Sequence, residues 1–147
     1  MNSKIVEILL IEDNPNDVEL TTRALKKHNL ANKLHVVKDG AEALEYFFDG
    51  IGSKDLNAEQ IPKVVLLDLK LPKVDGIEVL RRLKGDNRTR CIPVVILTSS
   101  NQEKDLDECY KLGANSYITK PVEFEAFFQA ILELGLYWLI LNKPPVQ

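Results

Sequence analysis

Four short runs that are typical of strands are each followed or ended by a residue that could take part in chemistry. The polar residues are Glu12-Asp13 after the run 6–11, Asp68 after the run that starts at Val64, Thr98 after the run 93–97, and Lys120 after the run 116–119. If the runs are parallel strands, their carboxyl ends meet at one edge of a sheet, where open α/β sheets hold their ligands. The sequence therefore predicts one crevice that contains three carboxylates, a hydroxyl and a lysine.

Three carboxylates that lie close together repel one another, so this crevice needs positive charge. Lys120 supplies one positive charge, and a divalent cation would supply the rest. Carboxylate oxygens without a His or Cys ligand favour Mg²⁺, or Mn²⁺, over zinc. Mg²⁺ typically takes only one or two carboxylates in a protein, keeps several waters and binds phosphoryl oxygens.

The elements that position these residues alternate between strand and helix periods along the whole chain, which predicts a doubly wound parallel sheet. The central run Val64-Val65-Leu66-Leu67 is typical of a strand buried on both faces, so Asp68 ends a central strand. We predict strands at 6–11, 34–37, 64–68, 93–97 and 116–119, each followed by a helix. Between the second helix and the third strand, residues 49–62 lose the pattern and are predicted to form a long exposed loop.

The composition of the chain favours some classes of protein and argues against others. A chain of 147 residues with 45% hydrophobic content is expected to form one soluble domain. A net charge of −3 argues against binding a nucleic-acid backbone. Cys91 and Cys109 have no metal-like spacing and are expected to be free thiols in a reducing cytoplasm. The apolar run 134–141 is much shorter than the ~20 residues that span a bilayer, so no membrane segment is expected.

The last predicted helix, 123–141, becomes apolar on most of its faces toward its end. A single domain cannot cover a terminal helix on every side, so this surplus predicts a partner. We expect a homodimer through the fourth helix, the fifth strand and the fifth helix. The predicted contact residues are Phe127, Tyr137, Trp138 and Leu139. The alternative is that the apolar tail folds back over the edge of its own sheet.

The same residues resemble a known family in their order and spacing. The shared motifs are Glu12-Asp13, Asp68 with Pro72 and Asp75-Gly76 after it, Thr98-Ser99, and Tyr117 followed by Lys120-Pro121. They resemble the receiver domain of two-component response regulators over nearly the whole chain. The resemblance implies a CheY-like sheet of strand order 2-1-3-4-5 with five helices, and a core of about 5–133. Residues 134–147 would form a helix extension and tail, which together with the long loop look like those of phytochrome-associated, stand-alone receivers.

The resemblance also implies a role for each residue of the crevice. Asp68 would accept a phosphoryl group from a phosphohistidine of a sensor histidine kinase, which the narrower likeness suggests is a phytochrome. Asp13, Asp68 and the backbone carbonyl of Lys70 would bind Mg²⁺ directly. Glu12 would act through a metal-bound water, and Lys120 would pair with the phosphoryl oxygens. Such a protein is a signalling module that catalyses only its own phosphorylation and dephosphorylation.

Two further residues would report the phosphorylated state. The resemblance implies that Thr98 turns to hydrogen-bond the phosphoryl group, and that Tyr117 moves inward into the vacated space. It also makes the bond before Pro121 a candidate cis peptide that aims Lys120. Neither His28 nor His35 lies at a strand end, so both are expected to be structural or surface residues.

Two other functions remain open at the level of sequence. The first is a pseudo-receiver, a scaffold that binds partners through its apolar last helix without being phosphorylated. The second is a hydrolytic phosphotransferase with an aspartyl nucleophile. Enzymes of that kind carry a second Asp two residues after the nucleophile, and here that position is Lys70, which argues against this function.

Overall fold

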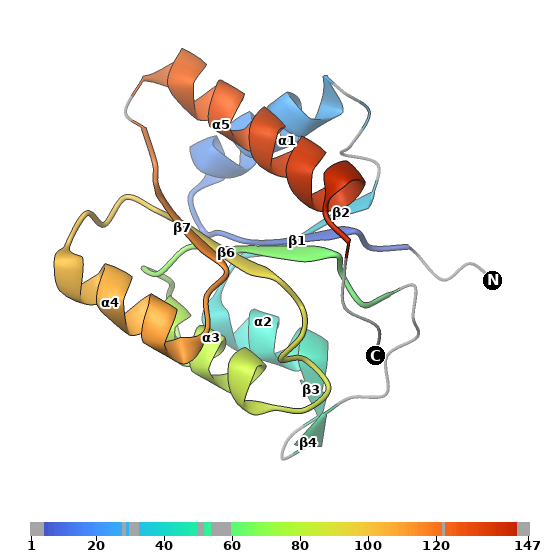
Figure 1. Cartoon of the computed structure of the whole chain (residues 1–147), viewed down its shortest axis with the longest axis vertical. Coiled ribbons are helices and arrows are strands. Elements are labelled where there is room, and N and C mark those ends of the chain that lie inside the picture. Colours follow the sequence, from blue (N-terminus) through green and yellow to red (C-terminus); the bar gives the residue numbers. More distant parts are fainter. Residues whose placement is uncertain are drawn as a thin grey trace.

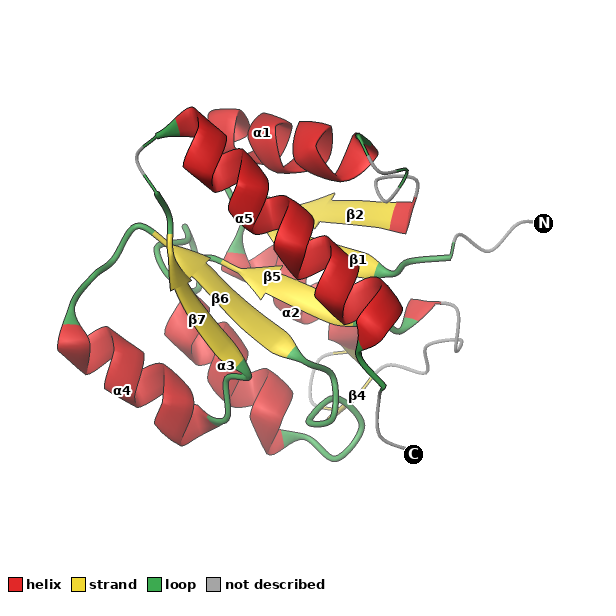
Figure 2. Cartoon of the chain, turned by 45° about the horizontal axis from the view of Figure 1, so that its top comes forward, coloured by secondary structure: helices red, strands yellow, loops and turns green. Residues whose placement is uncertain are grey.

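The computed structural model describes residues 5–27, 29, 33–49, 52–53, 60–121 and 123–143. Within them, a five-stranded sheet stands between two layers of helices (Figure 1). The strands are β1 (Ile8–Ile11), β2 (Leu34–Val37), β5 (Val64–Leu67), β6 (Val94–Thr98) and β7 (Ser116–Thr119). They lie in the order β2-β1-β5-β6-β7, and every neighbouring pair is parallel (Figure 2). This confirms the predicted doubly wound sheet of order 2-1-3-4-5.

The helices cover both faces of the sheet, as the alternating pattern predicts. On one face lie α1 (Pro15–Lys26) and α5 (Phe124–Leu136), side by side. The other face is covered by α2 (Gly40–Phe47), α3 (Gly76–Gly85) and α4 (Glu103–Leu112). With both faces covered, the strands can be apolar at successive positions, and all four residues of β1 and of β5 are buried.

The core divides into two layers because side chains alternate along a strand. In β1, Leu9 and Ile11 join the buried cluster beneath α2, α3 and α4. Their neighbours Ile8 and Leu10 join the cluster beneath α1 and α5. The central strands are thus packed from both sides, which holds their carboxyl ends in fixed positions.

The helices begin where the sequence places capping residues. Asn14, Asp39 and Asp75 precede α1, α2 and α3, and each side chain accepts a hydrogen bond from a backbone N–H of the first turn. No such side-chain bond caps α4 at Gln102, although the backbone N–H of Gln102 donates to the Ser100 hydroxyl at 3.3 Å. Gly113 ends α4 with a φ of 108°, a left-handed conformation that suits glycine.

The segment predicted as a long loop contains some regular structure. Phe48–Asp49 (β3) and Gly52–Ser53 (β4) form a short antiparallel pair, so the prediction of a patternless loop over 49–62 is wrong at Asp49 and at Gly52–Ser53. Residues 50–51 and 54–59 lie outside the described part of the chain. Two-residue strands are too short to leave a periodic signal, which explains why the sequence does not reveal them.

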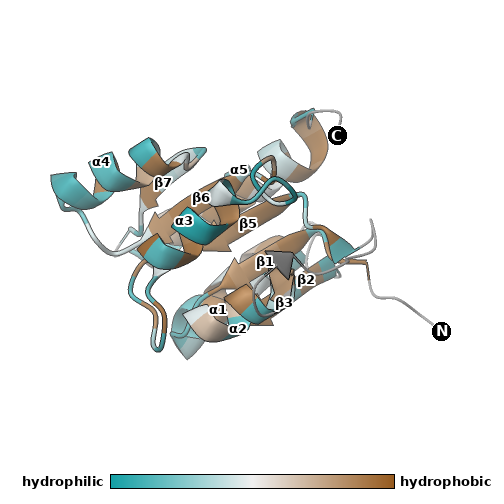
Figure 3. Cartoon of the chain, turned by 90° about the horizontal axis from the view of Figure 1, so that it is seen from below, coloured by the Kyte–Doolittle hydropathy of each residue, from teal (hydrophilic) through white to brown (hydrophobic). Residues whose placement is uncertain are grey.

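The C-terminal helix continues beyond α5 as one turn of π-helix, η3 (Tyr137–Leu141). It is coloured as hydrophobic over much of its length (Figure 3). Among the described residues, Phe124–Leu141 is the one helical stretch long and apolar enough to cross a membrane by length and composition. One such helix is weak evidence for a membrane span. Only 22% of this stretch is buried, and α5 packs Ile131 and Leu132 against the sheet layer.

The predicted interface residues of this helix do not share one surface. Phe127 is only 3% exposed and belongs to the core cluster beneath α1 and α5, so its assignment to an interface is wrong. Phe127 and Ile131 are four residues apart, so both face the sheet. Trp138 and Leu139 are half-buried against the same cluster, as expected if the tail folds back on its own domain. Of the four predicted residues, Tyr137 is the exposed one, at 48%.

Candidate functional site

The carboxyl ends of four strands meet at one edge of the sheet. Strand pairing places Ile11 of β1 beside Leu67 of β5, so the residues that follow them, Glu12 and Asp68, emerge next to each other. Thr98 ends β6 beside Thr119 of β7. The predicted crevice therefore forms, because parallel neighbours bring their last residues to the same edge.

Three carboxylates lie together at this edge. Glu12, Asp13 and Asp68 each offer an oxygen, and these oxygens all lie within 4.8 Å of one another. Glu12 and Asp68 are 2% and 7% exposed, whereas Asp13 is exposed. Hard oxygen donors that are partly open to solvent match the ligand preferences of Mg²⁺ and Mn²⁺, so the donor set fits the predicted metal.

The backbone around Asp68 is held on both sides. Its N–H donates to the carbonyl of Ile11 at 3.1 Å, and its Oδ1 accepts the N–H of Leu69 at 2.7 Å. Gly76, the first residue of α3, packs so closely that a Cβ there would overlap the carbonyl oxygen of Asp68. The carboxylate thus has one oxygen tied to the backbone and the other, Oδ2, turned toward Lys120.

Lys120 reaches into the acidic cluster from the end of β7. Its ammonium nitrogen lies 2.6 Å from Glu12 Oε1, 2.7 Å from Asp17 Oδ2 and 3.2 Å from Asp68 Oδ2. The lysine side chain is 9% exposed. An ammonium has three N–H donors, and here three carboxylates accept them. The expected counter-charge for the carboxylates is therefore present.

These contacts change the proton affinities of the two buried partners. Burial raises the pKa of Glu12 to about 7, because desolvation of the carboxylate outweighs the hydrogen bond that Lys120 donates. Burial by itself would lower the pKa of Lys120. The hydrogen bonds to Asp17 and Glu12, and the charge of Asp68, outweigh that effect and hold the pKa of Lys120 well above its usual value. The lysine therefore stays charged.

Asp17 is a member of the site that the sequence did not predict. It lies in the first turn of α1, and its carboxylate is 26% exposed. An acidic residue in a first turn is ordinarily explained by the helix dipole. The available signal was that α1 directly follows Glu12 and Asp13, so its first turn must sit over the same strand ends.

The predicted switch residues are joined through Ser100. Thr98 is fully buried, and its hydroxyl oxygen accepts the backbone N–H of Ser100 at 3.3 Å. Tyr117 packs against the buried cluster beneath α2, α3 and α4, and its hydroxyl donates to the carbonyl of Ser100 at 3.1 Å. The hydroxyl of Ser100 in turn lies 2.6 Å from Asp105 Oδ2 of α4. A bonded path thus leads from the end of β6 to α4.

The remaining predicted residues are placed as follows. The peptide bond before Pro121 is trans, so the prediction of a cis bond is wrong. Lys120 is aimed instead by its backbone N–H, which donates to the carbonyl of Thr98 at 2.7 Å, and by its three carboxylates. Lys70 has an exposed side chain beside the site. His35 lies in β2 with its ring centroid 5.4 Å from that of Tyr46, while His28 is outside the described residues.

Comparisons with known proteins agree on one family. Residues 8–132 match the family described as the response regulator receiver domain. The chain is 40% identical to the probable methanogenesis regulatory protein FilR2 of Methanothrix harundinacea, over 94% of this chain and 86% of that protein. It is 36% identical to the response regulator Rcp1 of a Synechocystis species, over 90% of this chain and 88% of Rcp1.

Solved structures resemble the whole fold. The phosphorylated cyanobacterial phytochrome response regulator RcpA superposes with a TM-score of 0.84 at 37% identity, covering 96% of this chain and 99% of RcpA. The Mn²⁺-bound form of Rcp1 superposes with a TM-score of 0.83 at 32% identity, with the same coverage of both chains. The likeness therefore extends beyond the sheet to nearly every described element.

Proposed function

Because the chain belongs to the response regulator receiver family, we propose that it accepts a phosphoryl group on Asp68 from a sensor histidine kinase. One observation carries the proposal: the Asp68 carboxylate contacts the ammonium of Lys120 and shares a 4.8 Å cluster with oxygens of Glu12 and Asp13. The protein would be a cytoplasmic signalling module that catalyses only its own phosphorylation and dephosphorylation. The phosphorylated state of its structural relative RcpA supports this function.

The reaction would depend on Mg²⁺ or Mn²⁺. Asp13 and Asp68 would hold the ion together with the backbone carbonyl of Lys70, and Glu12 would act through a bound water. The Mn²⁺-bound form of Rcp1 supports a divalent site in this fold. When bound, the ion would supply positive charge against the phosphoryl oxygens.

The chain's own residues would then perform the transfer. An oxygen of Asp68 forms a bond to phosphorus while the phosphorus–nitrogen bond of the kinase phosphohistidine breaks. The imidazole leaves with the electron pair of that bond and takes up a proton. Lys120, which already donates to Asp68 Oδ2, offers the same N–H to a phosphoryl oxygen. Catalysis by positioning and charge stabilisation is what phosphoryl transfer mainly requires.

The new phosphoryl group would shift the positions of Thr98 and Tyr117. Hydrogen bonds to a charged group are worth ~1.5–3 kcal/mol each, so contacts from Thr98 and Lys120 would supply about 3–6 kcal/mol. Inverting a two-state population from 1:99 to 99:1 takes roughly 5.5 kcal/mol, so two such contacts approach the required energy. Both Thr98 and Tyr117 bond to the backbone of Ser100, so a movement at the site would reach α4.

Intact mass spectrometry after incubation with acetyl phosphate tests the proposal. The wild type should gain one phosphoryl group in the presence of Mg²⁺ and none in its absence. Asp68→Asn should gain none, whereas Asp107→Asn, which changes an exposed Asp of α4, should behave as the wild type. A wild type that gains no phosphoryl group under any condition would contradict the proposal and favour the pseudo-receiver scaffold.

For the kinase, we propose a phytochrome, because RcpA is described as a phytochrome response regulator. Phosphotransfer from purified autophosphorylated kinases tests this choice. The phosphoryl group of a phytochrome kinase should pass to this protein faster than the phosphoryl group of an unrelated histidine kinase. Faster transfer from the unrelated kinase would contradict it.

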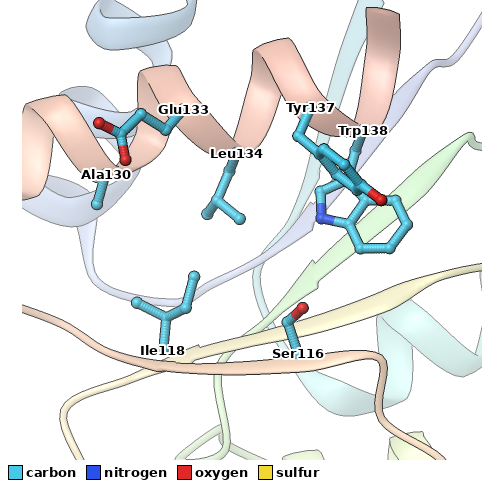
Figure 4. Close-up of a pocket in the computed structure, with 7 residues that line it drawn as sticks. All are labelled: Ser116, Ile118, Ala130, Glu133, Leu134, Tyr137 and Trp138. Carbon is cyan, nitrogen blue, oxygen red and sulfur yellow. The ribbon is translucent and has the colours of Figure 1, made fainter. Parts of the chain in front are cut away.

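We further propose a homodimer through α4, β7 and α5. Its apolar contacts would come from the end of the C-terminal helix, where Tyr137, Ile140 and Leu141 are 48%, 62% and 68% exposed. Beside them, a hollow of about 250 Å³ opens between β7 and α5, lined by residues that include Ile118 and Trp138 (Figure 4).

The oligomeric state tests this interface. Size exclusion with light scattering at micromolar concentration should give a dimer for the wild type. Ile140→Lys should shift the protein toward monomer, because it places a charge in the apolar contact. Ile61→Lys, which changes an exposed isoleucine outside α4, β7, α5 and η3, should leave the dimer intact. A monomeric wild type would refute the interface.

A further inference from the structure

The ammonium of Lys120 is held more firmly on one side than on the other. Its two shortest contacts go to Glu12 Oε1 at 2.6 Å and to Asp17 Oδ2 at 2.7 Å. The third, to Asp68 Oδ2, is longer at 3.2 Å. With two of its three N–H groups fixed, the ammonium cannot rotate freely, and its third N–H is directed at the carboxylate of Asp68.

We propose that Asp17 is a positioning residue that fixes the rotation of this ammonium, so that one N–H faces the phosphoryl group on Asp68. The inference rests on the proposed function of Asp68 as phosphoryl acceptor. During transfer, the bonds from Lys120 to Glu12 and Asp17 persist, and the third N–H moves from Asp68 Oδ2 to a phosphoryl oxygen.

Both ends of the Asp17–Lys120 contact are fixed by the backbone. The backbone N–H of Asp17 donates to the Asn14 side chain at 3.2 Å, and its carbonyl accepts the hydroxyl of Thr21 at 2.7 Å. The backbone N–H of Lys120 donates to the carbonyl of Thr98 at 2.7 Å. The carboxylate of Asp17 is therefore presented by a rigid first helical turn to a lysine anchored on β6, which is the arrangement that precise positioning requires.

Stability alone does not explain why Asp17 carries a carboxylate. Lys120 would still have two carboxylate acceptors, Glu12 and Asp68, without it. With Asp13, the site would already contain three negative groups for one lysine. A fourth carboxylate adds repulsion beside Glu12 and Asp68, which are only 2% and 7% exposed. A role in aiming the lysine accounts for a side chain at this position that accepts a hydrogen bond from its ammonium.

Phosphorylation rates separate this role from a structural one. With acetyl phosphate and saturating Mg²⁺, Asp17→Ala should be phosphorylated about tenfold more slowly than the wild type, the rate equivalent of one charge-assisted hydrogen bond. Asp17→Asn keeps an oxygen that can accept from Lys120, so it should recover most of the rate. Glu125→Ala, which removes an exposed first-turn acid from α5, controls for the helix dipole and should match the wild type.

Lysine-selective ¹⁵N NMR gives a second readout, recorded without phosphodonor or metal. In the wild type, the held ammonium of Lys120 should exchange its protons slowly and give a resolved signal, assigned by its loss in Lys120→Arg. The signal should disappear in Asp17→Ala and persist in Asp17→Asn. Urea unfolding of each variant verifies that it is folded under the assay conditions.

The possible failures can be told apart. If the wild type is phosphorylated and Asp17→Ala reacts equally fast or faster, the inference is overturned and the proposed function stands. An unchanged Lys120 signal in Asp17→Ala also overturns it. If the wild type takes no phosphoryl group on Asp68, the proposed function fails, and the inference fails with it.

Discussion

Lys120 is the one cation in contact with the acidic cluster among the described side chains, and replacing it should reveal how strongly that cluster depends on positive charge. Lys120→Met keeps the length of the side chain and removes the ammonium. Glu12 and Asp68, 2% and 7% exposed, would then lack their partner while remaining in a site that excludes most water. We expect the folded state to lose stability.

The loss of stability in Lys120→Met can be estimated from the contacts that Lys120 makes. Removing one partner of a buried ion pair typically costs ~3–5 kcal/mol, because the other charge is left uncompensated. Glu12 can relieve part of this cost by binding a proton, since burial already raises its pKa to about 7. We therefore expect a loss near the lower limit, about 3 kcal/mol, which for a domain of this size lowers the melting temperature by roughly 6–12 °C.

Urea and thermal unfolding at pH 7.5, with and without MgCl₂, measure this effect. Mg²⁺ should stabilise Lys120→Met more than it stabilises the wild type, because the ion supplies the missing positive charge. Lys63→Met is the matched control. Lys63 is half-exposed and pairs with Glu7 at 2.8 Å, and exposed pairs of this kind are worth only ~0–1 kcal/mol. A Lys120→Met protein as stable as the wild type, or one that gains nothing extra from Mg²⁺, would refute this account of the site.

Three further predictions test the surrounding fold. Gly76→Ala should destabilise the protein by about 1–3 kcal/mol in urea unfolding and slow phosphorylation, because the new Cβ overlaps the backbone carbonyl of Asp68. Gly85→Ala is the control: its Cβ meets nothing within 4 Å, so it should be neutral or stabilising by ~0.5–1 kcal/mol in the same assay. Burial raises the pKa of the Cys109 thiol to about 11, so at pH 8 a thiol reagent should modify exposed Cys91 rapidly and Cys109 only after unfolding. Because the pKa of Cys109 is higher in the folded state than in the unfolded chain, the contribution of Cys109 to the free energy of unfolding should fall as the pH rises from 9 to 11. Asn14→Ala removes the cap of α1 and should cost about 1 kcal/mol in urea unfolding, and an unchanged midpoint would contradict the capping role.

The architecture could be predicted from the sequence because its signals are local. Val64–Leu67 is apolar at every position, which is typical of a strand covered on both faces, and β5 is such a strand. Once the strands are parallel, their carboxyl ends must share an edge, so Glu12, Asp68 and Lys120 had to meet. The starts of α1, α2 and α3 also depend on local residues, because Asn14, Asp39 and Asp75 each accept a hydrogen bond from the first turn of the helix that follows.

Some features of the protein were decided only by the tertiary structure, because they depend on how each helix is rotated about its axis and on which distant residues it contacts. Asp17 joins a lysine 103 residues away, and its residue type alone does not distinguish it from an ordinary first-turn acid. Phe127 faces the core and Tyr137 faces solvent because packing fixes the rotation of α5, although both lie in a helix that is apolar on most faces. The bond before Pro121 is trans, and Lys120 is positioned by the backbone of Thr98 and by three carboxylates. Hydrophobic periodicity specifies which elements form; the contacts between their ends are fixed only when the core closes around them.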